Sequence, residues 1–202
     1  HVITRADVFA VSPMTDKFLR SIGLLPAFRL NYDGEGALEK NAVTFQVSEK
    51  ALIEGKTVIM YPEAGHQDKH WLGTFSLGYT KMAFEAAEMA KFEKDVQILP
   101  ACNHYSHYFG LRNRMLVKFG TPISLQPYYE LYKTKPRTAQ RDVNKLVREQ
   151  ISSMMLDIRD LENYEVIDFI RTTYGEDYAK KQGVNPNNLP ERLLTDQDLV
   201  TK

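Results

Sequence analysis

The sequence predicts an α/β fold: a single domain with a mostly parallel central sheet flanked by helices, followed by further C-terminal helices. The short apolar run at 57–61 is typical of a strand buried on both faces, and 96–99 is a second such run. Between them, the small and apolar residues of 77–91 recur at helical spacing. Strand, long loop, helix and strand make a right-handed crossover unit, which predicts two parallel strands.

The elements on either side extend this core. The chain opens on what looks like a strand at 2–4, and 23–30 holds another short strand, where Pro26 indicates an edge or a bulge. Apolar spacing predicts a helix over 36–54, with Gly55 as its stop. A further strand is expected at 115–119, ended by Gly120.

The C-terminal part has helical periodicity. An apolar stripe over 139–158 predicts a helix to about Arg159, and a second amphipathic stretch starts near Glu162. The polar end with Pro186 and Pro190 reads as a loosely ordered tail. We therefore expect an α/β domain over 1–158 and a helical extension with a polar tail over 159–202.

Composition excludes several classes of protein. The 202 residues are 43% hydrophobic and include 11 Tyr and 10 Phe, which excludes disordered, collagen-like and coiled-coil chains. Lys plus Arg and Asp plus Glu are both 26, so no bulk charge favours nucleic acid. A single cysteine, Cys102, fits a reducing compartment, and no apolar window approaches the roughly 20 residues of a membrane span.

The strongest local signal for chemistry is the loop at 61–70. It leaves the carboxyl end of a predicted strand, where open α/β sheets bind ligands. Within ten residues it holds a carboxylate, two imidazoles and an ammonium, from Glu63, His66, His70 and Lys69. An ordinary solvated connection between two elements is the alternative interpretation.

At this loop the sequence resembles the glycerolphosphate and lysophosphatidate acyltransferase family, and residues 103–108 followed by the strand at 117–123 look like its bacterial branch. The run Tyr-Pro-Glu-Ala-Gly-His at 61–66 is similar to the family's Phe-Pro-Glu-Gly block. Upstream, Gly23 is followed six residues later by Arg29, and downstream the strand at 97–99 ends at Pro100, as in two other blocks of the family. The similarity extends over roughly residues 1–158.

The resemblance implies transfer of a fatty acyl group from an acyl thioester to a hydroxyl of a glycerophospholipid precursor. The expected partners are acyl-coenzyme A or acyl carrier protein as donor, a lysophospholipid or glycerol phosphate as acceptor, and a membrane surface. No cofactor, metal or nucleic acid is implied. The expected location is the cytoplasm, peripheral on the inner face of the cell membrane.

The resemblance also implies roles for particular residues. Arg29 matches the arginine that contacts the acceptor's phosphate, although a surface ion pair is its alternative role. Glu63, the candidate catalytic residue, would accept a hydrogen bond from the acceptor alcohol or brace the loop. We expect substrate contacts from the residues of these blocks and the neighbouring ammonium: Gly23, Arg29, Tyr61, Pro62, Glu63, Ala64, Gly65, His66, Lys69 and Pro100.

The catalytic block of the family is missing from these residues. In the family a histidine in an Asn-His-x4-Asp block takes the proton of the acceptor hydroxyl, and the aspartate orients its ring. None of the five histidines is followed by Asp five positions later. We expect the block upstream of a chain that begins inside a longer sequence, and the chain as given to be inactive.

Two other functions remain as alternatives. One is a non-catalytic domain of the same fold that binds lipid or acyl thioester. The other is a metal-dependent hydrolase, because His66 and His70 have the spacing of a helical zinc site. Against it, Gln67 stands where the metalloprotease motif needs a glutamate.

Overall fold

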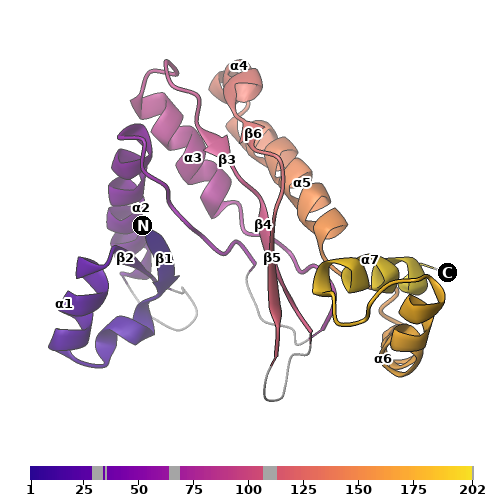
Figure 1. Cartoon of the computed structure of the whole chain (residues 1–202). Helices are drawn as coiled ribbons and strands as arrows, with labels where there is room; N and C mark the ends of the chain where they lie inside the picture. Colours follow the sequence, from indigo (N-terminus) through magenta and orange to yellow (C-terminus); the bar gives the residue numbers. More distant parts are fainter. Residues whose placement is uncertain (29–33, 35, 64–68, 107–112, 202) are drawn as a thin grey trace. The chain divides into compact units, whose positions relative to one another are not determined.

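The computed structural model describes residues 1–28, 34, 36–63, 69–106 and 113–201, and Figure 1 shows its elements. The chain is a mixture of helices and short strands, as expected for an α/β protein. In chain order these are β1 (Val2–Arg5), a 3₁₀ helix η1 (Ala6–Ala10), α1 (Pro13–Ser21), β2 (Leu24–Ala27), α2 (Ala37–Ile53), α3 (Gly78–Met89), β3 (Gln97–Ile98), β4 (Ala101–Tyr105), β5 (Met115–Phe119), β6 (Ile123–Ser124), a 3₁₀ helix η2 (Gln126–Tyr128), α4 (Tyr129–Thr134), α5 (Pro136–Met154), α6 (Tyr164–Lys181) and α7 (Leu189–Val200).

The chain forms two compact units that alternate along the sequence. The first comprises 1–64, 75–98 and 124–144, and the second comprises 65–74, 99–123 and 145–202. The division falls within α5, between Asn144 and Lys145.

Parallel strands form the framework of the first unit. β1 pairs with β2 in parallel, with Val2 opposite Leu24 and Arg5 opposite Ala27. On the other side of β1, Val2 forms a parallel bridge with Ile59. Two backbone hydrogen bonds hold that bridge, from Ile3 N–H to the Ile59 carbonyl and from Ile59 N–H to the His1 carbonyl, both 2.8 Å.

Helices and aromatic rings build the core of this unit. α2 packs against β2 and against α3, and the β1, β2 and α2 cluster is visible in Figure 1. Phe84 on α3 is fully buried and stacks on Tyr132 of α4, with ring centroids 4.5 Å apart. The Tyr129 hydroxyl donates 2.8 Å to the Lys94 carbonyl and so fixes the turn after α3.

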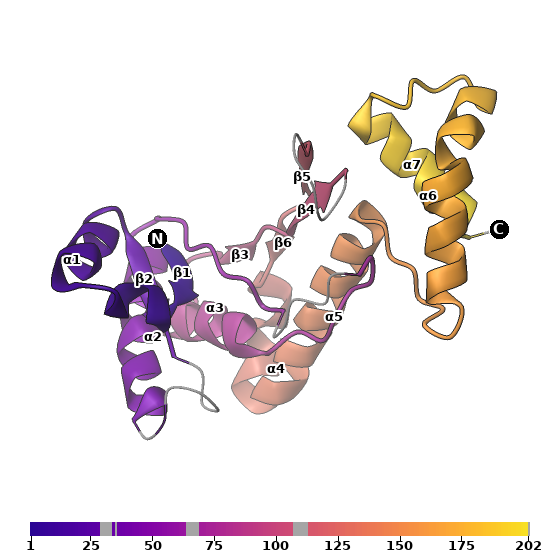
Figure 2. The same cartoon turned by 90° about the horizontal axis from the view of Figure 1, so that it is seen from below.

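The second unit contains an antiparallel pair of strands, the C-terminal part of α5 and the helices α6 and α7. β4 and β5 pair with Ala101 opposite Phe119 and Tyr105 opposite Met115. α6 and α7 pack against each other, and Figure 2 shows α7 crossing α6. The core is a cluster of buried residues, with Leu116 of β5 packed against it: Leu156, Ile158, Tyr164 and Leu193.

The structure confirms the expected helices and corrects the expected sheet. The helices over 36–54 and 77–91 are α2 and α3, and the strand at 115–119 is β5. However, the described residues form three two-stranded sheets, β1–β2, β3–β6 and β4–β5, instead of one mostly parallel sheet. The expected crossover pair is also absent there, because Ile59 bridges to β1 and β3 pairs with β6.

Two predictions for the C-terminal part were wrong. The stripe over 139–158 is helical only to Met154, and Leu156 and Ile158 reach the core from a non-helical segment. The polar end is ordered as α7, with Pro190 in its first turn, where a missing N–H has no intrahelical partner to lose. Leu193 is fully buried and provides the apolar contact that holds this helix.

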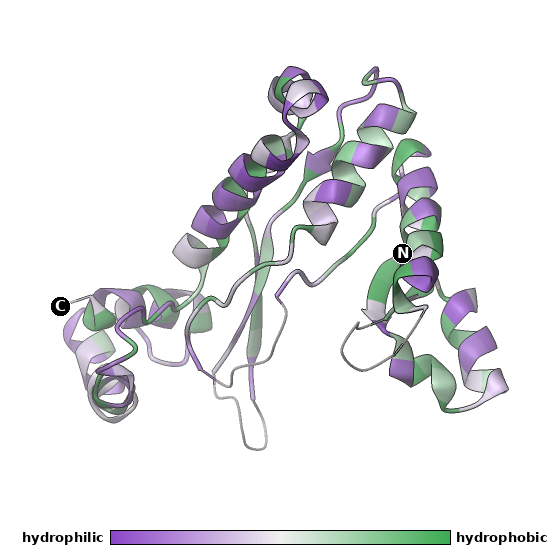
Figure 3. Cartoon of the chain, turned by 180° about the vertical axis from the view of Figure 1, so that it is seen from behind, coloured by the Kyte–Doolittle hydropathy of each residue, from purple (hydrophilic) through white to green (hydrophobic). Residues whose placement is uncertain are grey.

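Helix α5 has a hydrophilic face and a buried apolar face. Figure 3 shows hydrophilic residues along much of α5, whereas its apolar positions Ala139, Val143 and Val147 are buried. Among the described residues, no helix combines the length and the apolar character that a membrane crossing requires.

Candidate active site

The candidate site lies at the edge of the first unit where its parallel strands end. Because Val2 is level with both Leu24 and Ile59, the segments that follow β2, β1 and Ile59 leave the sheet at the same edge. Phe28 follows β2 there, and Tyr61 and Pro62 follow Ile59. This is the edge at which open α/β sheets bind ligands, and the structure therefore brings together two of the three blocks singled out from the sequence.

The loop that carries Glu63 is closed at its base by backbone pairing. Glu63 forms an antiparallel bridge with Phe75, and Ser76 N–H donates 3.0 Å to the Pro62 carbonyl. Two segments twelve residues apart in sequence are therefore fixed side by side at the strand edge. Glu63 is exposed there, and the Tyr61 side chain is 68% exposed, so both can meet a ligand from solution.

Gly23 shapes the entry to β2. Its φ of +87° lies in the left-handed region, which a residue with a Cβ adopts only with strain. Its carbonyl accepts from Val2 N–H at 3.1 Å, the first bond of the β1–β2 ladder. Gly23 thus acts on the path of the strand that leads to Arg29.

The other two described candidates belong to the second unit. Lys69 donates 2.9 Å to the Glu165 carboxylate and lies over the Tyr164 ring, 4.6 Å from its centroid. The hydrogen bond to Glu165 raises the pKa of Lys69, so this side chain is a cation. Pro100 is buried, and its carbonyl accepts from Gly120 N–H at 2.8 Å.

Four candidates lie outside the described residues: Arg29, Ala64, Gly65 and His66. Their substrate contacts stay predictions from the sequence. The aromatic and basic loop at 107–112 also lies outside the described part.

His70, the other member of the expected metal pair, is a buried residue of the second unit. Its backbone N–H donates 2.7 Å to the Tyr164 hydroxyl, and its ring lies 6.2 Å from that of His104, which is also buried. Burial lowers the pKa of each imidazole to about 4, and the positive charge of Arg171 acts in the same direction. In the described ranges, no group of three or more His, Cys, Asp or Glu side chains could hold a metal ion.

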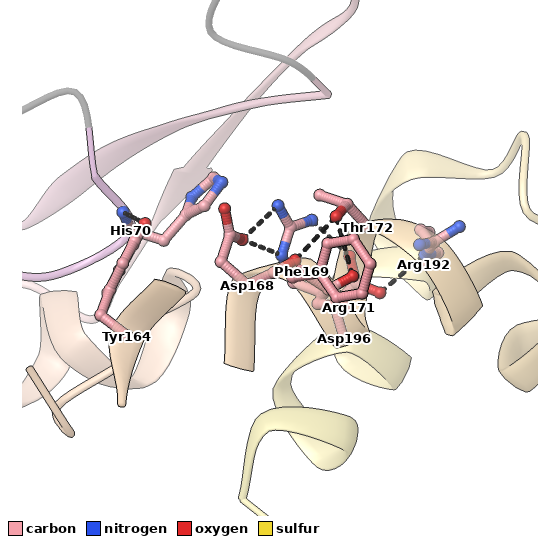
Figure 4. A network of polar contacts seen from close by, with 8 residues as sticks. All are labelled: His70, Tyr164, Asp168, Phe169, Arg171, Thr172, Arg192 and Asp196. Carbon is pink, nitrogen blue, oxygen red and sulfur yellow. Dashed lines mark hydrogen bonds and ion pairs between the residues drawn. The ribbon is translucent and has the colours of Figure 1, made fainter. Parts of the chain in front are cut away.

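A buried charge network lies beside His70, and no pattern in the sequence predicted it. Figure 4 shows Arg171 of α6 between Asp168 and Asp196, with Arg192 of α7 on the far side of Asp196. The closest nitrogen–oxygen distances are 2.7 Å for Arg171–Asp168, 3.4 Å for Arg171–Asp196 and 2.7 Å for Arg192–Asp196. The sequence contains the i, i+3 spacing of Asp168 and Arg171 and the i, i+4 spacing of Arg192 and Asp196, which are typical of ion pairs on a helix. The ion pair between Arg171 of α6 and Asp196 of α7 has no such local pattern.

Comparison with known proteins identifies the family of this chain. The acyltransferase family model matches residues 1–104, which is about half of the chain and contains the parallel strands and the Glu63 loop. The chain therefore belongs to the acyltransferase family.

Two curated relatives match at low identity. An uncharacterized acyltransferase of Schizosaccharomyces pombe is 29% identical over 127 residues, which is 62% of this chain and 19% of the relative. Glycerol-3-phosphate O-acyltransferase 2 of Saccharomyces cerevisiae is 29% identical over 135 residues, 66% of this chain and 18% of the relative. The chain thus spans less than a fifth of either relative. No solved structure matches the chain significantly.

Proposed function

We propose that this protein transfers a fatty acyl group from an acyl thioester, on coenzyme A or acyl carrier protein, to a hydroxyl of a glycerophospholipid precursor. The family match over residues 1–104 carries the proposal, because it covers the strand edge and the Glu63 loop. Glycerol 3-phosphate is the first acceptor to test, since a relative bears that substrate in its name.

The described geometry supports a binding role for this edge. Strands β1 and β2 and the segment at Ile59 end together, so the segment after β2 and the loop at Glu63 can act on one polar molecule. In the proposal, the guanidinium of Arg29 binds the phosphate and the Glu63 carboxylate accepts a hydrogen bond from an acceptor hydroxyl. Gly65 lets the loop backbone approach the ligand closely.

The transfer itself requires a base. The acceptor oxygen attacks the thioester carbonyl, its proton passes to the base, the carbon–sulfur bond breaks, and the thiol leaves with a proton. We assign the base to the family's His-x4-Asp block, which does not occur in residues 1–202. Glu63 is proposed to act on the acceptor and not as that base.

We further propose that the protein works at a membrane surface on its cytoplasmic side, because acylated products partition into lipid. The exposed apolar face of α1 supports this proposal: Met14 is 81% exposed, Phe18 59% and Ile22 56%. These residues are four apart, so they lie on one face of the helix. Such a face can enter the headgroup region of a bilayer.

The test is acceptor-dependent release of thiol from acyl-coenzyme A by the protein expressed with all flanking sequence that its gene encodes. We expect thiol release to rise when glycerol 3-phosphate or a lysophospholipid is added, with an acylated lipid as product. Residues 1–202 alone should give no transfer above background. Binding of acyl-coenzyme A without transfer to any of these acceptors would favour a non-catalytic binding domain instead.

A further inference from the structure

Among the described residues β2 pairs with β1 alone, and the backbone groups on its other side need other partners. The bond from Val2 N–H to the Gly23 carbonyl shows that odd-numbered residues of this strand point their polar groups toward β1. In a parallel strand these groups alternate between the two sides. Pro26 and Phe28 therefore point theirs away from β1, toward α2.

Two side chains of α2 take the place of a neighbouring strand. The Thr44 hydroxyl donates 2.8 Å to the Pro26 carbonyl. This bond satisfies the outward backbone group of Pro26, because proline has no N–H that would need a second partner. The Asn41 amide makes two bonds to Phe28: its oxygen accepts from Phe28 N–H at 2.9 Å, and its nitrogen donates 2.7 Å to the Phe28 carbonyl. A carboxamide suits this task because one planar group carries both an acceptor and a donor.

The hydrogen bonds from Thr44 and Asn41 reach two positions of the backbone that differ in their other contacts. Pro26 lies inside the β1–β2 ladder, opposite Thr4, whereas Phe28 lies beyond Ala27, the last paired residue. At Phe28 the path of the backbone is fixed by the two Asn41 bonds and by the Lys40 ammonium, 5.3 Å from the centroid of the Phe28 ring. The next residue in the sequence is Arg29.

We propose that Asn41 is a positioning residue for the acceptor's phosphate, because it fixes the backbone directly before Arg29. This inference rests on the proposed function and names how the strand end is held for binding. It makes α2 part of the acceptor site, although Asn41 itself need not touch the substrate. A displacement of about 1 Å at a binding group can reduce its effect by large factors.

The experiment measures binding of sn-glycerol 3-phosphate by calorimetry and, for the protein with its flanking sequence, the KM for each substrate. Asn41→Ala should weaken glycerol 3-phosphate by about tenfold or more while the KM for acyl-coenzyme A changes by less than about twofold. Thr44→Val is the matched control, since it removes a hydrogen bond from the same helix to the same strand. It should lower the melting temperature as Asn41→Ala does and leave glycerol 3-phosphate binding nearly unchanged.

A second variant separates the two Asn41 bonds. Asn41→Asp keeps an acceptor for Phe28 N–H but cannot donate to the Phe28 carbonyl, so we expect its loss of affinity to be smaller than that of Asn41→Ala. Arg29→Ala separates the positioning role of Asn41 from the strand-end site itself. If Arg29→Ala weakens glycerol 3-phosphate and Asn41→Ala does not, the positioning role is wrong and the proposed function stands. If neither variant weakens it, the strand-end site is wrong as well.

Discussion

Glu49 gives a prediction of stability that follows directly from its environment. This carboxyl lies on α2, is 7% exposed and hydrogen-bonds the Glu85 side chain of α3. Burial, and then the neighbouring Glu85, raise its pKa from 4.5 to about 7. The folded protein therefore favours the protonated form.

The sign of the pH dependence follows from this shift. Below pH 4.5 Glu49 is protonated in both states, and between pH 4.5 and about 7 the unfolded chain ionises first, so stability falls as pH rises. Above pH 7 the full penalty applies. It amounts to roughly 3 kcal/mol, because the pKa of Glu49 rises from 4.5 to about 7 and one pKa unit corresponds to about 1.4 kcal/mol.

Glu49→Gln removes the penalty and keeps the shape of the side chain. We expect its free energy of unfolding, measured by urea titration, to exceed that of the parent by about 2–3 kcal/mol at pH 8.5 and by almost nothing at pH 4.5. The control is Glu39→Gln, the same change at an exposed position of α2. A gain for Glu49→Gln that is equal at both pH values would refute the reasoning.

Three further predictions concern the second unit and the surface. His70 and His104 are neutral in the folded protein, so the free energy of unfolding should fall by up to about 2.7 kcal/mol per pH unit as pH falls from 6.5 toward 4. His104→Phe should halve this slope, and an unchanged slope would show that His104 does not contribute to it. Gly175→Ala places a Cβ 2.4 Å from Arg192 Nη2 and 3.1 Å from Asp196 Oδ1, so it should disturb this ion pair and lower the melting temperature although alanine favours the interior of α6 by about 1 kcal/mol. Gly183→Ala meets no atom within 4 Å and should cost only its left-handed strain of about 1 kcal/mol. A higher melting temperature for Gly175→Ala would show that Arg192 moves aside without cost. Met14→Ser with Phe18→Ser should reduce cosedimentation with anionic phospholipid vesicles, and retention of the parent's binding would exclude α1 as the contact.

Local periodicity explains which parts of the fold could be predicted. α2 and α3 have apolar residues at helical spacing and clear ends. Pro26 indicated an edge or a bulge, and in the described part of the chain β2 is an edge strand that pairs with β1. α7 was missed because its turn is rich in polar residues and proline, while the contact that holds it, through Leu193, is made with distant residues. The pairing of Val2 with Ile59 joins residues far apart in sequence, which no local pattern encodes.

Some features of the candidate site could likewise be predicted from the sequence, and others could not. The Glu63 loop was singled out from the sequence because charged residues follow an apolar run that predicted a strand. In the structure this run forms a single bridge, from Ile59 to Val2, and the role of Glu63 in binding stays a prediction. The two bonds from Asn41 to Phe28 could not be foreseen, since an asparagine inside a helical pattern is usually a surface residue. Likewise, the bond from Lys69 to Glu165 joins residues 96 positions apart.

The central claim is that the acceptor's phosphate is bound where the parallel strands end, and Arg29→Ala tests it most directly. Measured as KM for glycerol 3-phosphate against KM for acyl-coenzyme A, the loss of a charge-assisted contact of about 1.5–3 kcal/mol predicts a rise of about tenfold to a hundredfold for the acceptor alone. An equal rise for both substrates, or none for the acceptor, would contradict the claim.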